Sequence, residues 1–175
     1  MAKAPEKIYR EASGRVWETM GALEALGIAI YNEQAAYDFY RNLEHTIENE
    51  SGKNKFKFLA EDEQRHRRLL EEQYEKESDG QKFVYDSGRA KTVDVTVDSQ
   101  ASAVDAVDLA LEAEKAAHEF YKQAAEKTND EEGRRMFERL AEDEENHYET
   151  LRAEREALLG GPYWFSADEH RMMES

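Results

Sequence analysis

Two acidic octets ending in histidine stand 81 residues apart in the chain. The first reads LAEDEQRH (residues 59–66) and the second LAEDEENH (residues 140–147), and six of the eight positions are identical. In each octet a glutamate is followed three positions later by a histidine. Carboxylate oxygens and imidazole nitrogens both bind divalent metal ions. The repeated Glu-x-x-His spacing therefore suggests that each octet supplies part of a metal site.

Positions three and four apart share one face of a helix, so the neighbours of each glutamate show which face it occupies. Both Glu-x-x-His pairs fall on an apolar face. The residues of the two faces are Phe56, Leu59, Ala60, Glu63, His66 and Leu70, and Phe137, Leu140, Ala141, Glu144, His147 and Leu151. The other acids of the octets fall elsewhere on the helices and are expected to be solvated; they are Glu61, Asp62, Glu142 and Asp143.

The same offset relates two segments that precede the octets. AIYNEQAAYDFY (29–40) matches ALEAEKAAHEFY (110–121) at six positions. Each segment contains one glutamate, Glu33 or Glu114, in the centre of an otherwise apolar helical stripe. The repeat therefore covers two helices in each half of the chain, which predicts a duplicated helical hairpin with internal pseudo-twofold symmetry.

The helical patterns that must position these residues extend over most of the chain. We expect four helices, over residues 15–48, 54–77, 101–127 and 130–159. Short joints at 49–53 and 128–129 predict that the helices of each hairpin are antiparallel. Gly160, Gly161 and Pro162 end the last helix.

This organisation predicts one all-α domain over residues 1–175, a four-helix bundle built from two hairpins. Its parts are the half-repeats 15–77 and 101–159, the crossover 78–100 and the C-terminal tail 160–175. The crossover contains Gly80, Gly88 and β-branched residues that interrupt the helical pattern, and it is long enough to cross the bundle.

Four glutamates and two histidines would meet at one level of such a bundle. An unpaired carboxylate is costly to bury, and four together repel one another. Two divalent cations would balance the charges, and neutral imidazoles would complete the coordination. The predicted ligands are Glu33, Glu63, His66, Glu114, Glu144 and His147. The alternative is a metal-free bundle whose repeat preserves a charged helical face, with the histidines as ordinary core residues.

The composition excludes several other kinds of site. The chain has no cysteine, so it holds no disulfide, no cysteine-ligated zinc and no iron–sulfur cluster. Its net charge of −16 argues against binding nucleic acid through a basic patch. No run approaches the roughly 18 apolar residues that span a membrane, and residues 1–15 lack the apolar core of a signal peptide. We therefore expect a cytoplasmic location.

With its Glu, Glu-x-x-His, Glu, Glu-x-x-His set, the chain resembles the ferritin-like superfamily, and most of all its rubrerythrin-like branch, over residues 21–159. The resemblance implies a di-iron centre with Glu33 and Glu114 as terminal ligands, Glu63 and Glu144 as bridging ligands, and His66 and His147 as one imidazole on each metal. It also implies that Tyr40 and Tyr121, seven residues after the terminal glutamates, donate hydrogen bonds to ligand carboxylates. Manganese or a mixed iron–manganese pair fits the same ligand types.

Several features depart from the family pattern. Rubrerythrins with a rubredoxin domain carry four cysteines that this chain lacks, so electrons would come from a separate donor such as rubredoxin or a reductase. Ala117 stands where peroxidase-type members have an extra glutamate. His118 beside it is a candidate ligand, proton donor or packed core histidine. Gln64 and Glu145 replace the methionine of haem-binding bacterioferritins, so no haem is expected.

The resemblance favours an oxidoreductase that reduces hydrogen peroxide or dioxygen at the di-iron centre. Tyr40, Tyr121 and His118 are then candidate sources of hydrogen bonds or protons. A ferroxidase that oxidises Fe(II) would use the same ligands and is the main alternative. Members of the rubrerythrin-like branch commonly form dimers, so we also expect a homodimer.

Overall fold

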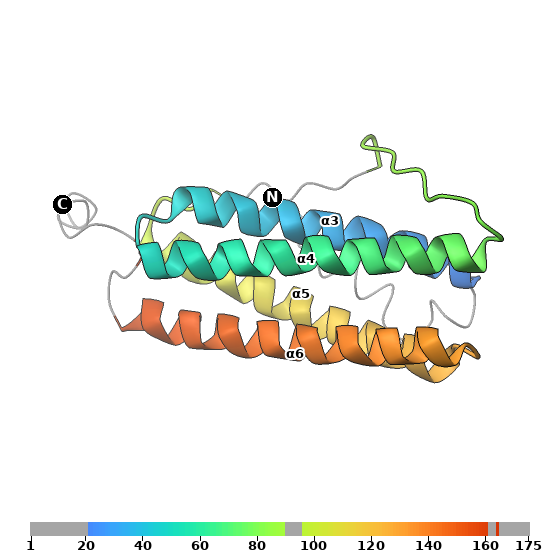
Figure 1. Cartoon of the computed structure of the whole chain (residues 1–175). Coiled ribbons are helices and arrows are strands. Elements are labelled where there is room, and N and C mark those ends of the chain that lie inside the picture. The colour runs from blue at the N-terminus through green and yellow to red at the C-terminus, as the bar shows by residue number, and fades with distance from the viewer. Residues whose placement is uncertain (1–20, 90–95, 161–163, 165–175) are drawn as a thin grey trace.

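The computed structural model describes residues 21–89, 96–160 and 164. Four long α-helices lie side by side and form an elongated bundle (Figure 1). They are α3 (Ala22–Thr46), α4 (Glu50–Glu77), α5 (Gln100–Lys127) and α6 (Glu131–Leu159). No strand occurs in these described ranges. The all-α bundle predicted from the sequence is confirmed.

The helices pack as two antiparallel hairpins. Helix α3 packs against α4 and α5 packs against α6, while α4 also contacts α6 and joins the two hairpins. The crossover leaves the end of α4 through Asp79 and Gly80, which have φ values of 56° and 89°. Glycine tolerates this left-handed conformation without a steric penalty. Residues 81–89 then run back along the outside of the bundle (Figure 1).

Side-chain caps decide where α4 and α6 begin. The Asn49 side chain accepts a hydrogen bond from the Gly52 N–H at 3.0 Å, and Asp130 accepts one from the Gly133 N–H at 2.8 Å. Such caps satisfy amide groups that the first helical turn leaves without partners. The predicted joint at 49–53 is therefore wrong, because the Asn49 cap starts α4 at Glu50 rather than at residue 54.

The apolar core consists of two clusters separated by a polar layer. One cluster includes Ile30, Leu70 and Phe137, and the other includes Tyr40, Phe56 and Leu151. Along every helix, the predicted ligands lie between residues of the first cluster and residues of the second. The helices thus hold the candidate ligands at one level, with apolar packing on both sides.

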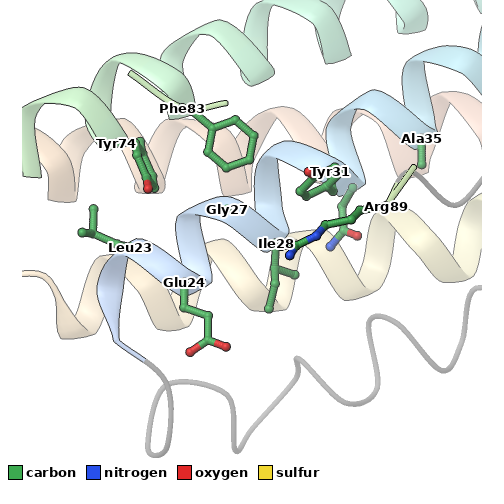
Figure 2. A pocket seen from close by; sticks show the side chains of 10 residues that line it. Leu23, Glu24, Gly27, Ile28, Tyr31, Ala35, Tyr74, Phe83 and Arg89 are labelled. Carbon is green, nitrogen blue, oxygen red and sulfur yellow. The ribbon is translucent and has the colours of Figure 1, made fainter. Parts of the chain in front are cut away.

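The crossover is attached to the outer surface of α3 by aromatic contacts. Tyr31 accepts a hydrogen bond from the Asp86 N–H at 3.0 Å, and Phe83 packs edge-on against Tyr31 and Tyr74 at 5.6 and 5.2 Å. Beside these contacts lies a pocket of about 410 Å³, shown in Figure 2. None of the six predicted ligands lines this pocket.

Trp164 is the one described residue of the tail beyond Gly160, and it is fully buried. Its ring meets Phe56 edge-on at 5.3 Å, and its indole N–H donates to Glu154 at 2.8 Å. Glu154 also pairs with Lys55, so this buried carboxylate has two partners. Trp164 therefore packs on one end of the bundle.

None of the described helices is long and apolar enough to cross a membrane.

Candidate metal centre

All six predicted ligands are buried at the same level of the bundle. The exposed fraction of each is 3 % or less. Helices α3 and α5 each contribute one glutamate, and α4 and α6 each contribute a Glu-x-x-His pair. The structure therefore brings together all six glutamates and histidines that the sequence predicted as ligands.

The ligand atoms form two groups of four that share two members. The first group is Glu33, Glu63, His66 and Glu144, and the second is Glu63, Glu114, Glu144 and His147. Within each group the candidate ligand atoms lie within 4.8 Å of one another. Glu63 and Glu144 belong to both groups, which is the arrangement that two bridging carboxylates require.

Each imidazole presents its Nδ1 to carboxylates of both hairpins. His66 Nδ1 lies 2.9 Å from Glu144 and 3.5 Å from Glu63. His147 Nδ1 lies 3.1 Å from Glu63 and 3.5 Å from Glu144. The two rings are nearly parallel, with centroids 5.5 Å apart. The pseudo-twofold symmetry of the sequence thus reappears as two matching donor sets.

Four buried atoms of this layer have no hydrogen-bond partner among the described residues. They are Glu63 Oε1, His66 Nδ1, Glu144 Oε1 and His147 Nδ1. Leaving such atoms unsatisfied in the interior costs about 1–3 kcal/mol each. All four belong to the two donor groups, and oxygen and imidazole nitrogen atoms in such groups suit divalent iron, manganese or zinc. The residues present therefore fit a pair of divalent cations.

The pKa values of the four carboxyl groups separate into two pairs. Burial raises the pKa of Glu33 and of Glu114, and the negative charges of Glu63 and Glu144 raise both further. Burial also opposes ionisation of Glu63, but the neighbouring Glu33 and both nearby imidazoles lower its pKa to about 2. The pKa of Glu144 is lowered in the same way, by Glu114 and the histidines.

The pKa values of the two imidazoles are also shifted by the carboxylates around them. Burial disfavours the imidazolium form, but the hydrogen bonds that the histidines donate to Asp143 and Asp62, and the negative charges of the surrounding glutamates, raise the pKa of His66 and of His147. Without metal, protons on the histidines and on the terminal glutamates therefore balance the negative charge of the layer. Metal ions would replace these protons.

Two tyrosines donate hydrogen bonds to the terminal glutamates across the hairpins. The Tyr40 hydroxyl donates to Glu114, and the Tyr121 hydroxyl donates to Glu33. Burial and the charge of Glu114 raise the pKa of Tyr40, so its hydroxyl stays a donor. The hydrogen bonds expected for these two residues are present, and each one links α3 to α5.

His118 lies apart from both donor groups. Its Nδ1 is 2.7 Å from the backbone carbonyl oxygen of Ala141, and its side chain lines a pocket of about 680 Å³ with Glu138 and Glu142. The ring is half-buried and faces α6. A role for His118 as a proton donor remains a prediction.

Asp62 and Asp143 are only partly exposed and each contacts a histidine, so the expectation that they are simply solvated surface residues is wrong. His147 Nε2 lies 3.2 Å from Asp62, and His66 Nε2 lies 3.3 Å from Asp143. Each aspartate therefore accepts a hydrogen bond from the histidine of the other hairpin. The hydrogen bond from His147 lowers the pKa of Asp62, and that from His66 lowers the pKa of Asp143.

These hydrogen bonds orient the imidazoles. A histidine that donates its Nε2–H to a carboxylate leaves the Nδ1 lone pair available for a metal ion. An aspartate stands at the same position of both octets, Asp62 in the first and Asp143 in the second, and this repetition was a signal for the role. Helical periodicity obscured it, because both residues lie on the flank of their helix rather than on the apolar face.

Comparison with known proteins agrees with this geometry. The rubrerythrin family model matches residues 24–155, which is most of the chain. The chain belongs to the rubrerythrin family. No curated protein matches this rubrerythrin family member significantly.

Two solved structures are similar to this rubrerythrin family member. A hypothetical protein from Pyrococcus furiosus is 35 % identical, with a TM-score of 0.73, and the match covers 82 % of this chain and 95 % of that one. The bacterioferritin-related protein from Bacteroides fragilis, described as a dodecameric thioferritin, is 21 % identical with a TM-score of 0.65. That match covers 96 % of this chain and 95 % of the other, and it shows the shared ferritin-like fold.

Proposed function

We propose that this rubrerythrin family member is a di-iron oxidoreductase that reduces hydrogen peroxide, or dioxygen, with electrons from a separate donor. The observation that carries the proposal is the pair of buried donor groups, whose unsatisfied atoms Glu63 Oε1, Glu144 Oε1, His66 Nδ1 and His147 Nδ1 all lie in one layer. Membership of the rubrerythrin family supports iron as the metal.

Each metal position would have one terminal carboxylate, one imidazole and two shared carboxylates. Glu33 and His66 would hold one ion, Glu114 and His147 the other, and Glu63 and Glu144 would bridge them. When bound, two ferrous ions would supply two electrons, which together with two protons convert one molecule of hydrogen peroxide to two molecules of water. Carboxylates suit this chemistry because they are hard, anionic ligands that favour ferric iron. Manganese in one or both positions is compatible with the same donors.

Tyr40 and Tyr121 would orient the terminal glutamates and hold a proton close to them. Each hydroxyl donates to one oxygen of its glutamate and leaves the other oxygen, Glu114 Oε2 or Glu33 Oε2, on the side of the histidines. This orientation restricts rotation of the carboxylate and keeps a donor at each metal position. The apolar clusters on both sides of the layer would limit access of bulk water.

Electrons would come from another protein, because the chain has no cysteine with which to hold a rubredoxin-type iron. A rubredoxin or a reductase is the proposed donor. We also propose that the chain functions as a homodimer in the cytoplasm and binds neither haem nor nucleic acid.

A ferroxidase is the second candidate, and Ala117 favours it. Ala117 is buried and lies three residues after Glu114. Rubrerythrins of the peroxidase type, which this chain resembles, have a glutamate at this position, so its absence weakens the peroxidase assignment. In this alternative, Fe(II) is a substrate that enters the layer, gives its electron to dioxygen and leaves as Fe(III).

Rapid mixing separates these functions. The chain is loaded anaerobically with about two Fe(II) per molecule and mixed with hydrogen peroxide or with dioxygen. Faster oxidation by peroxide, with stoichiometric turnover, supports the peroxidase. Faster oxidation by dioxygen that continues as more Fe(II) is added supports the ferroxidase. Failure to bind two ions would contradict both and favour the metal-free bundle.

A further inference from the structure

We propose that Arg65 is a positioning residue that holds both histidine–aspartate pairs of the metal centre from outside the bundle core. The proposal rests on the proposed metal-binding function. It assigns to one side chain, which is not a metal ligand, an influence on both metal positions.

One guanidinium group connects aspartates of the two hairpins. Arg65 Nη2 donates to Asp62 Oδ1 and to Asp143 Oδ2, both at 3.0 Å, and Arg65 Nε donates to Asp62 Oδ1 at 3.2 Å. The planar fork of a guanidinium can bind two carboxylates at once with fixed geometry. Arg65 therefore joins α4 to α6 at the level of the metal centre.

Both aspartates that contact Arg65 also contact a histidine. Asp62 Oδ2 accepts from His147 Nε2, and Asp143 Oδ2 accepts from His66 Nε2. The aspartates are partly exposed, with side-chain exposed fractions of 20 % and 22 %. Without Arg65 they would be freer to turn toward solvent, and both imidazoles would lose part of the support that orients Nδ1 toward the carboxylates.

The internal repeat does not provide a second clamp. The position equivalent to Arg65 in the second octet is Asn146, which is exposed and too short to join two aspartates. A single arginine thus serves both halves of a centre that is otherwise built twice. A substitution at this one position should affect both metal positions, whereas substitution of a terminal glutamate should affect one.

The competing explanation is an ordinary surface ion pair, since 39 % of the Arg65 side chain is exposed. Such pairs contribute little to stability, and their loss has no specific effect on metal binding. Metal affinity therefore separates the two explanations. Arg68, on the same helix, bonds only to Gln64 among the contacts described and is a matched control for the lost charge.

The test is an anaerobic Co(II) titration of the full chain, followed by calorimetry and visible absorption. We expect Arg65→Gln to weaken both Co(II) binding steps by about tenfold each, the lower end of the effect of losing outer partners of metal ligands. Arg65→Lys should also weaken both, because lysine keeps the charge but lacks the fork. Arg68→Gln should bind like the wild type.

Combined substitutions test whether Arg65 acts on metal affinity through Asp62 and Asp143. In a chain carrying Asp62→Asn and Asp143→Asn, adding Arg65→Gln should cause no further loss of Co(II) affinity. Wild-type affinity in Arg65→Gln, or a further loss in the aspartate variant, would overturn the proposal while leaving the metal centre intact. If the wild-type chain binds no Co(II), the proposed function itself is overturned.

Discussion

Glu63 and Glu144 each belong to both donor groups, whereas Glu33 and Glu114 each belong to one. Substitution of these residues should therefore have different effects on metal content. We expect Glu33→Ala to reduce the bound metal from about two ions per chain to about one, and Glu63→Ala to remove both. Metal analysis after anaerobic loading and desalting measures the difference.

The control for this series is Glu61→Ala, which removes an exposed carboxylate from the same helix. It should retain both ions. Equal losses in Glu33→Ala and Glu63→Ala would contradict the assignment of shared and terminal carboxylates.

Tyr40 is a buried donor whose acceptor, Glu114, is also buried. Removal of the hydroxyl in Tyr40→Phe leaves a carboxylate oxygen without this donor. We expect the free energy of unfolding of the metal-free chain to fall by about 1–3 kcal/mol, measured by urea denaturation. Tyr121→Phe should have a similar effect through Glu33, whereas Tyr37→Phe, on the partly exposed side of α3, should change little. Similar losses for Tyr37→Phe and Tyr40→Phe would refute this explanation.

At the scale of elements, the hairpin geometry depends on where α4 begins. The Asn49 cap sets this point, and Asp130 does the same for α6. Asn49→Ala should lower the free energy of unfolding by about 1 kcal/mol, because the Gly52 N–H loses its acceptor. Asn49→Gly should lower it by only a few tenths of that amount, since glycine is tolerated at this position. Thermal or urea denaturation measures both, and equal losses would show that the side-chain cap is not responsible.

For the whole molecule, the buried layer makes stability depend on pH when metal is absent. Glu33 and Glu114 have pKa values raised above the ordinary 4.5, so their contribution is present below pH 4.5 and is lost as pH rises. His66 and His147 have pKa values raised above 6.5, so their contribution is lost as pH rises above that value. Glu63, with a pKa of about 2, contributes above pH 4.5 and loses that contribution as pH falls.

These signs predict that the layer stabilises the metal-free chain most near pH 4.5. Urea denaturation between pH 4.5 and 8 should show decreasing stability in the metal-free wild type. A chain carrying Glu33→Gln and Glu114→Gln should show a weaker decrease, because two of the responsible groups are gone. With metal bound the trend should reverse, since binding requires deprotonated ligands. An identical pH dependence in the variant and the wild type would contradict the assignment.

Much of the fold was predictable because helical periodicity is a local property. The repeat identified two hairpins, and the apolar faces placed six ligand candidates at one level, where the structure has them. The start of α4 was less predictable, because Asn49 acts through a single side-chain hydrogen bond rather than through a pattern. Trp164 was also unassigned, since its burial depends on contact with Phe56 at the end of the bundle.

The sequence by itself determined which residues could bind metal, because residue type and helical spacing are enough to place a glutamate or histidine on an apolar face. Only the tertiary structure decided how those residues are supported. Asp62, Asp143 and Arg65 lie on the flanks of their helices and matter only because α4 packs against α6. Contacts between hairpins depend on the packing of segments far apart in the chain, so helical periodicity in the sequence does not predict them.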